Sequence, residues 1–199
     1  MARICVFGSS TVSDEYFLGF DCWVSKLREF VGDMSVFNLG ISGDDMVKLL
    51  ERMDGECTAR NPDIIIIRNG SNDAKLVDDK PACSLETFKE NMRKAITIAE
   101  QYTEEVFIVG NHPVNEAKTN PAVWDVHERW TNDNLRAFNE AMRTICAEED
   151  LIFIDVFDEW SRQDYQHLLD DEDGLHLSEQ GHQLLFDIIK AALAEQKLI

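Results

Sequence analysis

The chain has 199 residues, of which 44% are hydrophobic, so it is long enough to bury a substantial core and short enough to form one domain over residues 1–199. Its 38 acidic and 19 basic residues give a formal net charge of −19, a field that repels nucleic acid and anionic membrane surfaces. Nucleic acid is therefore excluded as a partner, and the lack of any run of about 20 apolar residues excludes a membrane span.

Cysteine usage predicts a reducing compartment. Five cysteines are scattered along the chain with no C-x-x-C pair among them: Cys5, Cys22, Cys57, Cys83 and Cys146. This pattern is typical of small buried side chains and not of a disulfide or zinc framework. The chain also opens directly on a strand-like apolar run, which leaves no room for a signal peptide. We therefore expect a cytoplasmic protein with no metal site.

Strands and helices are predicted to alternate along the chain. Short apolar runs rich in β-branched residues indicate strands that are covered on both faces, and apolar residues at three- and four-residue spacing indicate the helices between them. Ser84, Thr131 and Ser178 stand where helix N-caps are expected. In chain order the predicted elements are strand 4–7, helix 17–30, a weaker strand 35–39, helix 44–53, strand 64–67, helix 85–99, strand 106–109, helix 135–145, strand 151–156 and helix 184–192. Such alternation predicts an α/β fold, a three-layer α/β/α sandwich around a parallel sheet.

The loops after the strands carry the polar residues of interest. Ligands of parallel sheets bind beyond the carboxyl ends of the strands, so these loops are expected to meet at one edge. They contain hydroxyls, glycines, an amide and an Asp-x-x-His pair, in Gly8-Ser9-Ser10-Thr11, in residues 38–43, in Asn69-Gly70-Ser71-Asn72-Asp73 and in Asp173-Gly174-Leu175-His176. Acyl transfer needs such groups, namely a hydroxyl nucleophile, an imidazole base, a carboxylate that orients it, and N–H donors for the oxyanion.

Four of these blocks resemble those of the SGNH hydrolases, also called the GDSL esterase family. That family has Gly-Asp-Ser near the N-terminus, a Gly in the second block, Gly-x-Asn-Asp in the third and Asp-x-x-His near the C-terminus. The matching residues here are Gly8-Ser9-Ser10, Gly40, Gly70-Ser71-Asn72-Asp73 and Asp173-Gly174-Leu175-His176. The one departure is Ser9, which stands where the family has Asp; this makes Ser9 the second candidate, after Ser10, for the attacking serine.

The resemblance implies the role of each site residue. Ser10 would be the nucleophile, His176 the general base and Asp173 the carboxylate that orients it. The Ser10 and Gly40 N–H groups and the Asn72 amide would form the oxyanion hole. It also implies a flavodoxin-like order for the five-stranded sheet, and no metal or organic cofactor. A metal site built from Asp173, His176 and His182 is a weaker alternative, because no other Cys or His clusters with them.

The long segment after the fourth strand is a candidate substrate wall. Residues 111–130 contain Trp124, Arg129 and Trp130, which either pack this loop onto the body or recognise a sugar or an acyl group.

The expected function is that of a serine esterase acting on a short acyl ester of a small molecule or carbohydrate, with an acetyl ester on a carbohydrate as the first candidate. The alternatives are a thioesterase or lysophospholipase of the same family, a flavodoxin-like ligand-binding module, and a relative that has lost catalysis because Ser9 replaces the usual Asp.

Overall fold

The core of the fold is a parallel sheet of five strands. The structure is a computed structural model that describes residues 2–14 and 19–199. The strands are β1 (Arg3–Gly8), β2 (Ser35–Gly40), β3 (Ile64–Arg68), β6 (Val106–Val109) and β8 (Ile152–Ile154). Their order across the sheet is β2-β1-β3-β6-β8, and every pair is parallel. This confirms the predicted flavodoxin-like arrangement.

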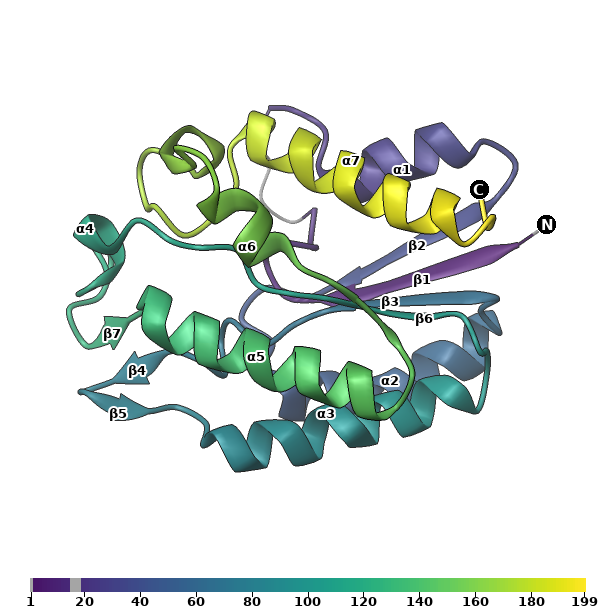
Figure 1. Ribbon diagram of the computed structural model, residues 1–199, viewed down its shortest axis with the longest axis horizontal. Helices are drawn as coiled ribbons and strands as arrows, with labels where there is room; N and C mark the ends of the chain where they lie inside the picture. The colour runs from purple at the N-terminus through teal and green to yellow at the C-terminus, as the bar shows by residue number, and fades with distance from the viewer. Residues whose placement is uncertain (1, 15–18) are drawn as a thin grey trace.

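Helices cover both faces of the sheet (Figure 1). On one face lie α1 (Trp23–Val31) and α7 (Glu179–Glu195), and on the other lie α2 (Met46–Arg60), α3 (Leu85–Glu100) and α5 (Asn132–Glu148). Short helical segments α4 (Glu116–Thr119), α6 (Val156–Ser161) and η1 (Gln166–Leu168) lie in the connections. In β3, Ile65 and Ile67 pack toward the α2–α3–α5 layer, and Ile64 and Ile66 pack toward the α1–α7 layer.

Side-chain caps fix where the helices begin. The predicted caps are confirmed, because Ser84, Thr131 and Ser178 each accept a hydrogen bond from an N–H in the first turn of α3, α5 and α7, respectively. Asp45 caps α2 in the same way. This helix runs on to Arg60, well past the predicted end at residue 53, and stops where Asn61 adopts a left-handed conformation before Pro62.

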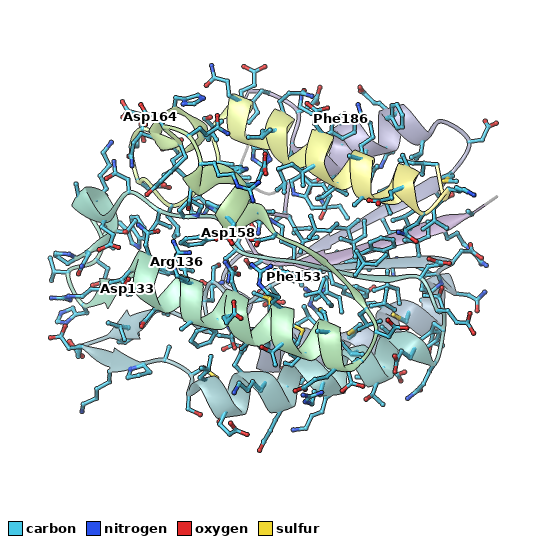
Figure 2. All side chains as sticks on the ribbon, in the orientation of Figure 1. Asp133, Arg136, Phe153, Asp158, Asp164 and Phe186 are labelled. Atoms are coloured by element: carbon cyan, nitrogen blue, oxygen red, sulfur yellow. The ribbon has the colours of Figure 1, made fainter. Side chains whose placement is uncertain are left out.

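The boundaries of a predicted strand and of the first predicted helix also differ from the structure. The predicted strand 151–156 is shorter, because the Asp155 side chain accepts from the Asp158 N–H at 3.0 Å and starts α6 at Val156. In Figure 2, Asp158 of α6 lies near Arg136 of α5, and the two side chains form an ion pair at 3.2 Å. The predicted helix 17–30 starts at Trp23, and residues 17 and 18 lie outside the described residues.

A second, small antiparallel sheet was not predicted. It has the order β5-β4-β7 and is built from β4 (Leu76–Val77), β5 (Lys80–Pro81) and β7 (Glu128–Arg129). Figure 1 shows it beside α4, at the opposite end of the molecule from the two termini. It joins the segment after β3 to the segment after β6.

Two structural observations relate to the predicted cysteine pattern and to the predicted absence of a membrane span. All five cysteines are free, and all except Cys83 are buried. Among the described residues, no helix has both the length and the apolar character needed to cross a membrane.

We expect Ile66→Ala to lower the free energy of unfolding by about 2–5 kcal/mol, because Ile66 is fully buried in the central strand and its truncation leaves a cavity. Urea denaturation measures this loss. The control is Val126→Ala, at a side chain that is 67% exposed, which should change stability by no more than about 0.5 kcal/mol. Equal losses in both variants would contradict the assigned core.

Candidate active site

The chain brings together Ser10 and His176, which are 166 residues apart in sequence. Ser10 lies in the turn that follows β1, and His176 lies in the loop before α7. The His176 Nδ1 atom is 2.6 Å from Asp173 Oδ2, and its Nε2 atom is 2.9 Å from Ser10 Oγ. With the ring proton on Nδ1 donated to Asp173, Nε2 is free to accept the Ser10 hydroxyl proton. The three side chains thus form a hydrogen-bonded chain of carboxylate, imidazole and hydroxyl.

Asp173 is held as an anion by its own loop. Its Oδ1 atom accepts the N–H groups of Leu175 at 2.7 Å and of His176 at 2.9 Å. Burial pushes the pKa of this carboxyl upward, but the hydrogen bonds from His176 and Leu175 and the charge of the imidazole outweigh it and leave the pKa below its ordinary value. A charged Asp173 can therefore orient His176 and stabilise its protonated form.

Three candidate oxyanion donors meet at the same cavity, which has a volume of about 770 Å³ and is lined by Ser10, Gly43 and Asn72 among others. No hydrogen bond among the described residues uses the N–H groups of Ser10 or Gly43. The Asn72 Nδ2 atom donates to Asp44 O at 2.9 Å. An amide nitrogen carries two N–H groups, so this bond fixes the side chain and leaves the second N–H for a ligand.

Gly40, the oxyanion donor expected from the sequence, does not occupy that position. Its N–H donates to Asn38 Oδ1 at 3.0 Å, and Gly40 is absent from the cavity lining. A Cβ at this residue would lie 2.3 Å from Ser13 N, so a glycine is required because the loop that carries Ser10 packs directly against it. Gly43, which the sequence analysis did not single out, lies at the cavity instead with a φ of 79°.

The residues proposed as a substrate wall divide into two groups. Trp124 and Trp130 line the cavity with ring centroids 5.5 Å apart, and Trp124 is 46% exposed. Trp130 is buried, and its Nε1 donates to Ser71 O at 2.9 Å. Arg129 is not among the residues that line the cavity, because its guanidinium pairs with Asp79 at 3.2 Å.

The cavity is predominantly acidic. Four of its lining residues are carboxylates, and Lys75 is the one lysine or arginine among them: Glu128, Asp170, Glu172, Asp173 and Lys75. The Lys75 ammonium is already paired with Glu128 and lies 5.5 Å from the centre of the Trp130 ring. Such a wall attracts cationic molecules, repels anionic ones and leaves neutral ones unaffected. Neither Lys75 nor Glu128 carries a motif that could have marked it in the sequence.

His182 also lines the cavity, and its imidazole is hydrogen-bonded to the backbone of α1. Its Nδ1 accepts the Trp23 N–H at 3.3 Å. Burial, helped by the positive charge of Arg68, lowers the pKa of this imidazole to about 4. Among the residues that the structure describes, no three His, Cys, Asp or Glu side chains are grouped so that they could hold a metal ion.

Comparison with known proteins points to one family. The sequence profile of the GDSL-like lipase/acylhydrolase family matches residues 6–184. The GDSL esterase/lipase WDL1 of Oryza sativa subsp. japonica is 26% identical over 202 residues, which cover 96% of this chain and 76% of that protein.

Solved structures share the fold. The lipase/acylhydrolase from Enterococcus faecalis superposes with a TM-score of 0.79 and 23% identity, over 98% of this chain and 97% of that one. The acetyl xylan esterase AlAXEase superposes with a TM-score of 0.75 and 16% identity, over 96% of this chain and 99% of that one.

Asp73, which follows Asn72, gives a test of the site's electrostatics. Its buried carboxylate accepts the Met46 N–H at 3.1 Å, and burial raises its pKa to about 7 despite that bond. Because the ordinary value is about 3.9, the folded state binds the proton more tightly, and stability falls as the pH rises from about 4 to about 7.

We therefore expect the Tm of Asp73→Asn to rise relative to that of the wild-type protein as the pH increases from 5 to 8, because only the wild type has to ionise a buried carboxyl. The amide keeps an acceptor for Met46 N–H but cannot ionise. Thermal unfolding at a series of pH values measures this, with the exposed Asp33→Asn as the control for the loss of one charge. A difference that does not vary with pH would contradict the assignment.

Proposed function

The chain belongs to the GDSL-like lipase/acylhydrolase family, and from this premise we propose that it is a serine esterase that hydrolyses a short acyl ester through an acyl-enzyme on Ser10. The observation that carries the proposal is the hydrogen-bonded chain from Asp173 through His176 to Ser10. A hydroxyl, an imidazole and a charged carboxylate in this order form the arrangement that activates a serine for acyl transfer.

The proposed reaction has two halves. His176 Nε2 takes the Ser10 proton while Oγ attacks the ester carbonyl, and the resulting imidazolium is stabilised by Asp173. The tetrahedral intermediate collapses, His176 returns the proton to the leaving alcohol, and the acyl group stays on Ser10. Water then attacks this acyl-enzyme with His176 again as base, which releases the acid and restores the serine.

The oxyanion formed in both halves would be held by the N–H groups of Ser10 and Gly43 and by the Asn72 amide. Gly43 takes the role that the sequence analysis gave to Gly40, because Gly43 lines the cavity and its N–H has no hydrogen-bond partner among the described residues. The Asn72 donor is fixed in advance by Asp44 O, so it does not have to reorganise during the reaction.

Ser9, which replaces the family's Asp, is compatible with activity. It is buried, and its carbonyl accepts the N–H groups of Val12 at 3.0 Å and of Ser13 at 2.9 Å. The nucleophile turn is therefore held by its own backbone. The alternative of a catalytically inactive relative loses its motivation, and a phosphate-binding module is disfavoured because no Lys or Arg lies in residues 8–12.

The cavity favours a neutral alcohol group in the substrate, and we propose an acetyl ester on a carbohydrate. The exposed Trp124, in the same cavity as Ser10, offers an apolar face to a sugar ring, and the carboxylates of Asp170 and Glu172 offer acceptors to its hydroxyls. The same carboxylates would repel the phosphates of a coenzyme A thioester or a lysophospholipid. The fold shared with AlAXEase, an acetyl xylan esterase, agrees with this choice.

Ser10→Ala should lower the rate of p-nitrophenyl acetate hydrolysis by roughly 10³-fold or more, as removal of a serine nucleophile does elsewhere. Ser9→Ala is the matched control and should keep the wild-type rate, because Ser9 takes no part in the hydrogen-bonded chain. Circular dichroism confirms that both variants are folded. If Ser10→Ala is as active as the wild type, the proposed nucleophile is wrong.

Trp124→Ala should raise KM for glucose pentaacetate by roughly 3- to 10-fold, the size of a lost aromatic contact, and leave kcat/KM for ethyl acetate within about twofold. Steady-state kinetics with the two esters separate recognition of the sugar from chemistry. Val126→Ala, an exposed apolar residue outside the cavity lining, is the control and should change neither value. An equal loss with both esters would reject a sugar-binding role for Trp124.

A further inference from the structure

A buried arginine with no carboxylate partner lies behind the candidate site. Arg68, the last residue of β3, is 2% exposed and takes part in none of the ion pairs between described residues. Its Nη1 donates to Gly110 O at 3.1 Å, and its Nη2 atom lies 2.7 Å from His112 Nδ1. Burial lowers the pKa of the guanidinium to about 10, so it stays protonated at neutral pH. A buried charge of this kind is costly, and its position calls for an explanation.

The arginine fixes the state of His112. A guanidinium has donors only, so His112 Nδ1 must accept, and the ring proton therefore resides on Nε2. That Nε2–H donates to Leu175 O at 2.8 Å. Burial and, next, the charge of Arg68 lower the pKa of His112 to about 3, which keeps the ring neutral. The ring also packs against Trp160, with centroids 5.3 Å apart.

The acceptor of this hydrogen bond is the peptide group that leads into His176. The N–H of the same peptide, which belongs to His176, donates to Asp173 Oδ1 at 2.9 Å. One side of the peptide is thus held by His112 and the other by Asp173. The neighbouring carbonyls of Gly174 and His176 accept backbone N–H groups from Asn115 and Asp170, whereas the Leu175 carbonyl is held by a side chain.

We propose that Arg68 and His112 are positioning residues for ester hydrolysis, which orient the Leu175–His176 peptide and through it aim the imidazole at Ser10. The inference rests on the proposed function, since it assigns these residues to the same site. Arg68 sets the ring proton of His112, His112 orients the peptide, and the peptide carries the base. Neither residue touches the cavity, so their effect is on the rate of the chemical step and not on substrate binding.

If Arg68 and His112 had only a structural role, apolar side chains of similar volume could replace them without loss of activity. Replacing a buried charge and its hydrogen-bond acceptor together by hydrophobic residues of similar volume is often neutral or stabilising, whereas removing one partner leaves the other unpaired. The double variant Arg68→Met/His112→Leu therefore removes the network without leaving a buried charge behind. It separates a role in orientation from a role in stability.

The experiment compares this double variant with the control Arg162→Met/His167→Leu, which makes the same two changes at exposed positions. We expect the buried double variant to stay folded at the assay temperature but with a lower Tm, because the carbonyls of Gly110 and Leu175 lose their donors. It should lose roughly tenfold in kcat for p-nitrophenyl acetate and keep KM within about twofold, as expected for a displaced base. His112→Gln, whose amide can accept from Arg68 and donate to Leu175 O, should retain most of the activity that His112→Leu loses.

A second readout does not depend on turnover. In the double variant the amide proton of His176 should exchange with solvent faster than in the control, because its peptide is held on one side only; NMR hydrogen exchange measures this. A kcat equal to that of the control together with unchanged exchange would overturn the proposal and leave the network a structural one. If Ser10→Ala in the same assay keeps the wild-type rate, the proposed function fails, and the exchange rates still decide whether the network holds His176.

Discussion

The parallel register of β1 between β2 and β3 is the constraint on which the site depends. Gly8, the last residue of β1, pairs with Gly40 on one side and with Arg68 on the other, so the three strands end level with one another. This alignment needs close backbone contact, because a Cβ at Gly8 would lie 2.4 Å from Arg68 O and one at Gly40 would lie 2.3 Å from Ser13 N. Level strand ends bring the loops after them to one edge, where Ser10 meets Gly43 and Asn72.

Charge at this edge has opposite effects on the two partners of the reaction. Asp173 would stabilise the imidazolium that forms when His176 takes the Ser10 proton, but the carboxylates around the cavity disfavour a negative oxygen on the substrate. Neutral N–H donors resolve the conflict, because they act over a hydrogen-bond distance and bring no net charge that would destabilise the imidazolium. The buried Arg68 does not line the cavity, and its positive charge lowers the pKa of His112 and of His182. Their low pKa values make both of those rings weak bases, whereas the proposed base His176 lies 2.9 Å from Ser10 Oγ.

The elements that could be predicted from the sequence are those marked by a continuous apolar run or by a side chain that bonds within its own helical turn. The strands covered on both faces are consecutive apolar runs, and the helix caps are single side chains that bond within their own first turn, so both are readable without tertiary structure. Ser10, Asp173 and His176 were singled out because the order of their blocks matches a family. Gly43 was missed because two glycines follow the predicted strand 35–39, and which of them faces the cavity depends on how the loop that carries Ser10 packs against Gly40. Arg68 and His112 were missed because an arginine ending a strand resembles a surface residue until its burial is known.

The small antiparallel sheet was unpredictable for the same reason, since strands of two residues have no periodicity. It nonetheless shapes the substrate side of the cavity. It joins the chain after β3 to the chain after β6, and the pair of Lys75 with Glu128 spans the same two segments. Trp130, which follows this sheet, donates to the carbonyl of Ser71, the residue before Asn72. The wall that would contact the alcohol and the amide that would hold the oxyanion are therefore parts of one hydrogen-bonded unit. Trp124 is the exposed part of that wall, so replacing it would alter the contact with the alcohol and leave the donors in place.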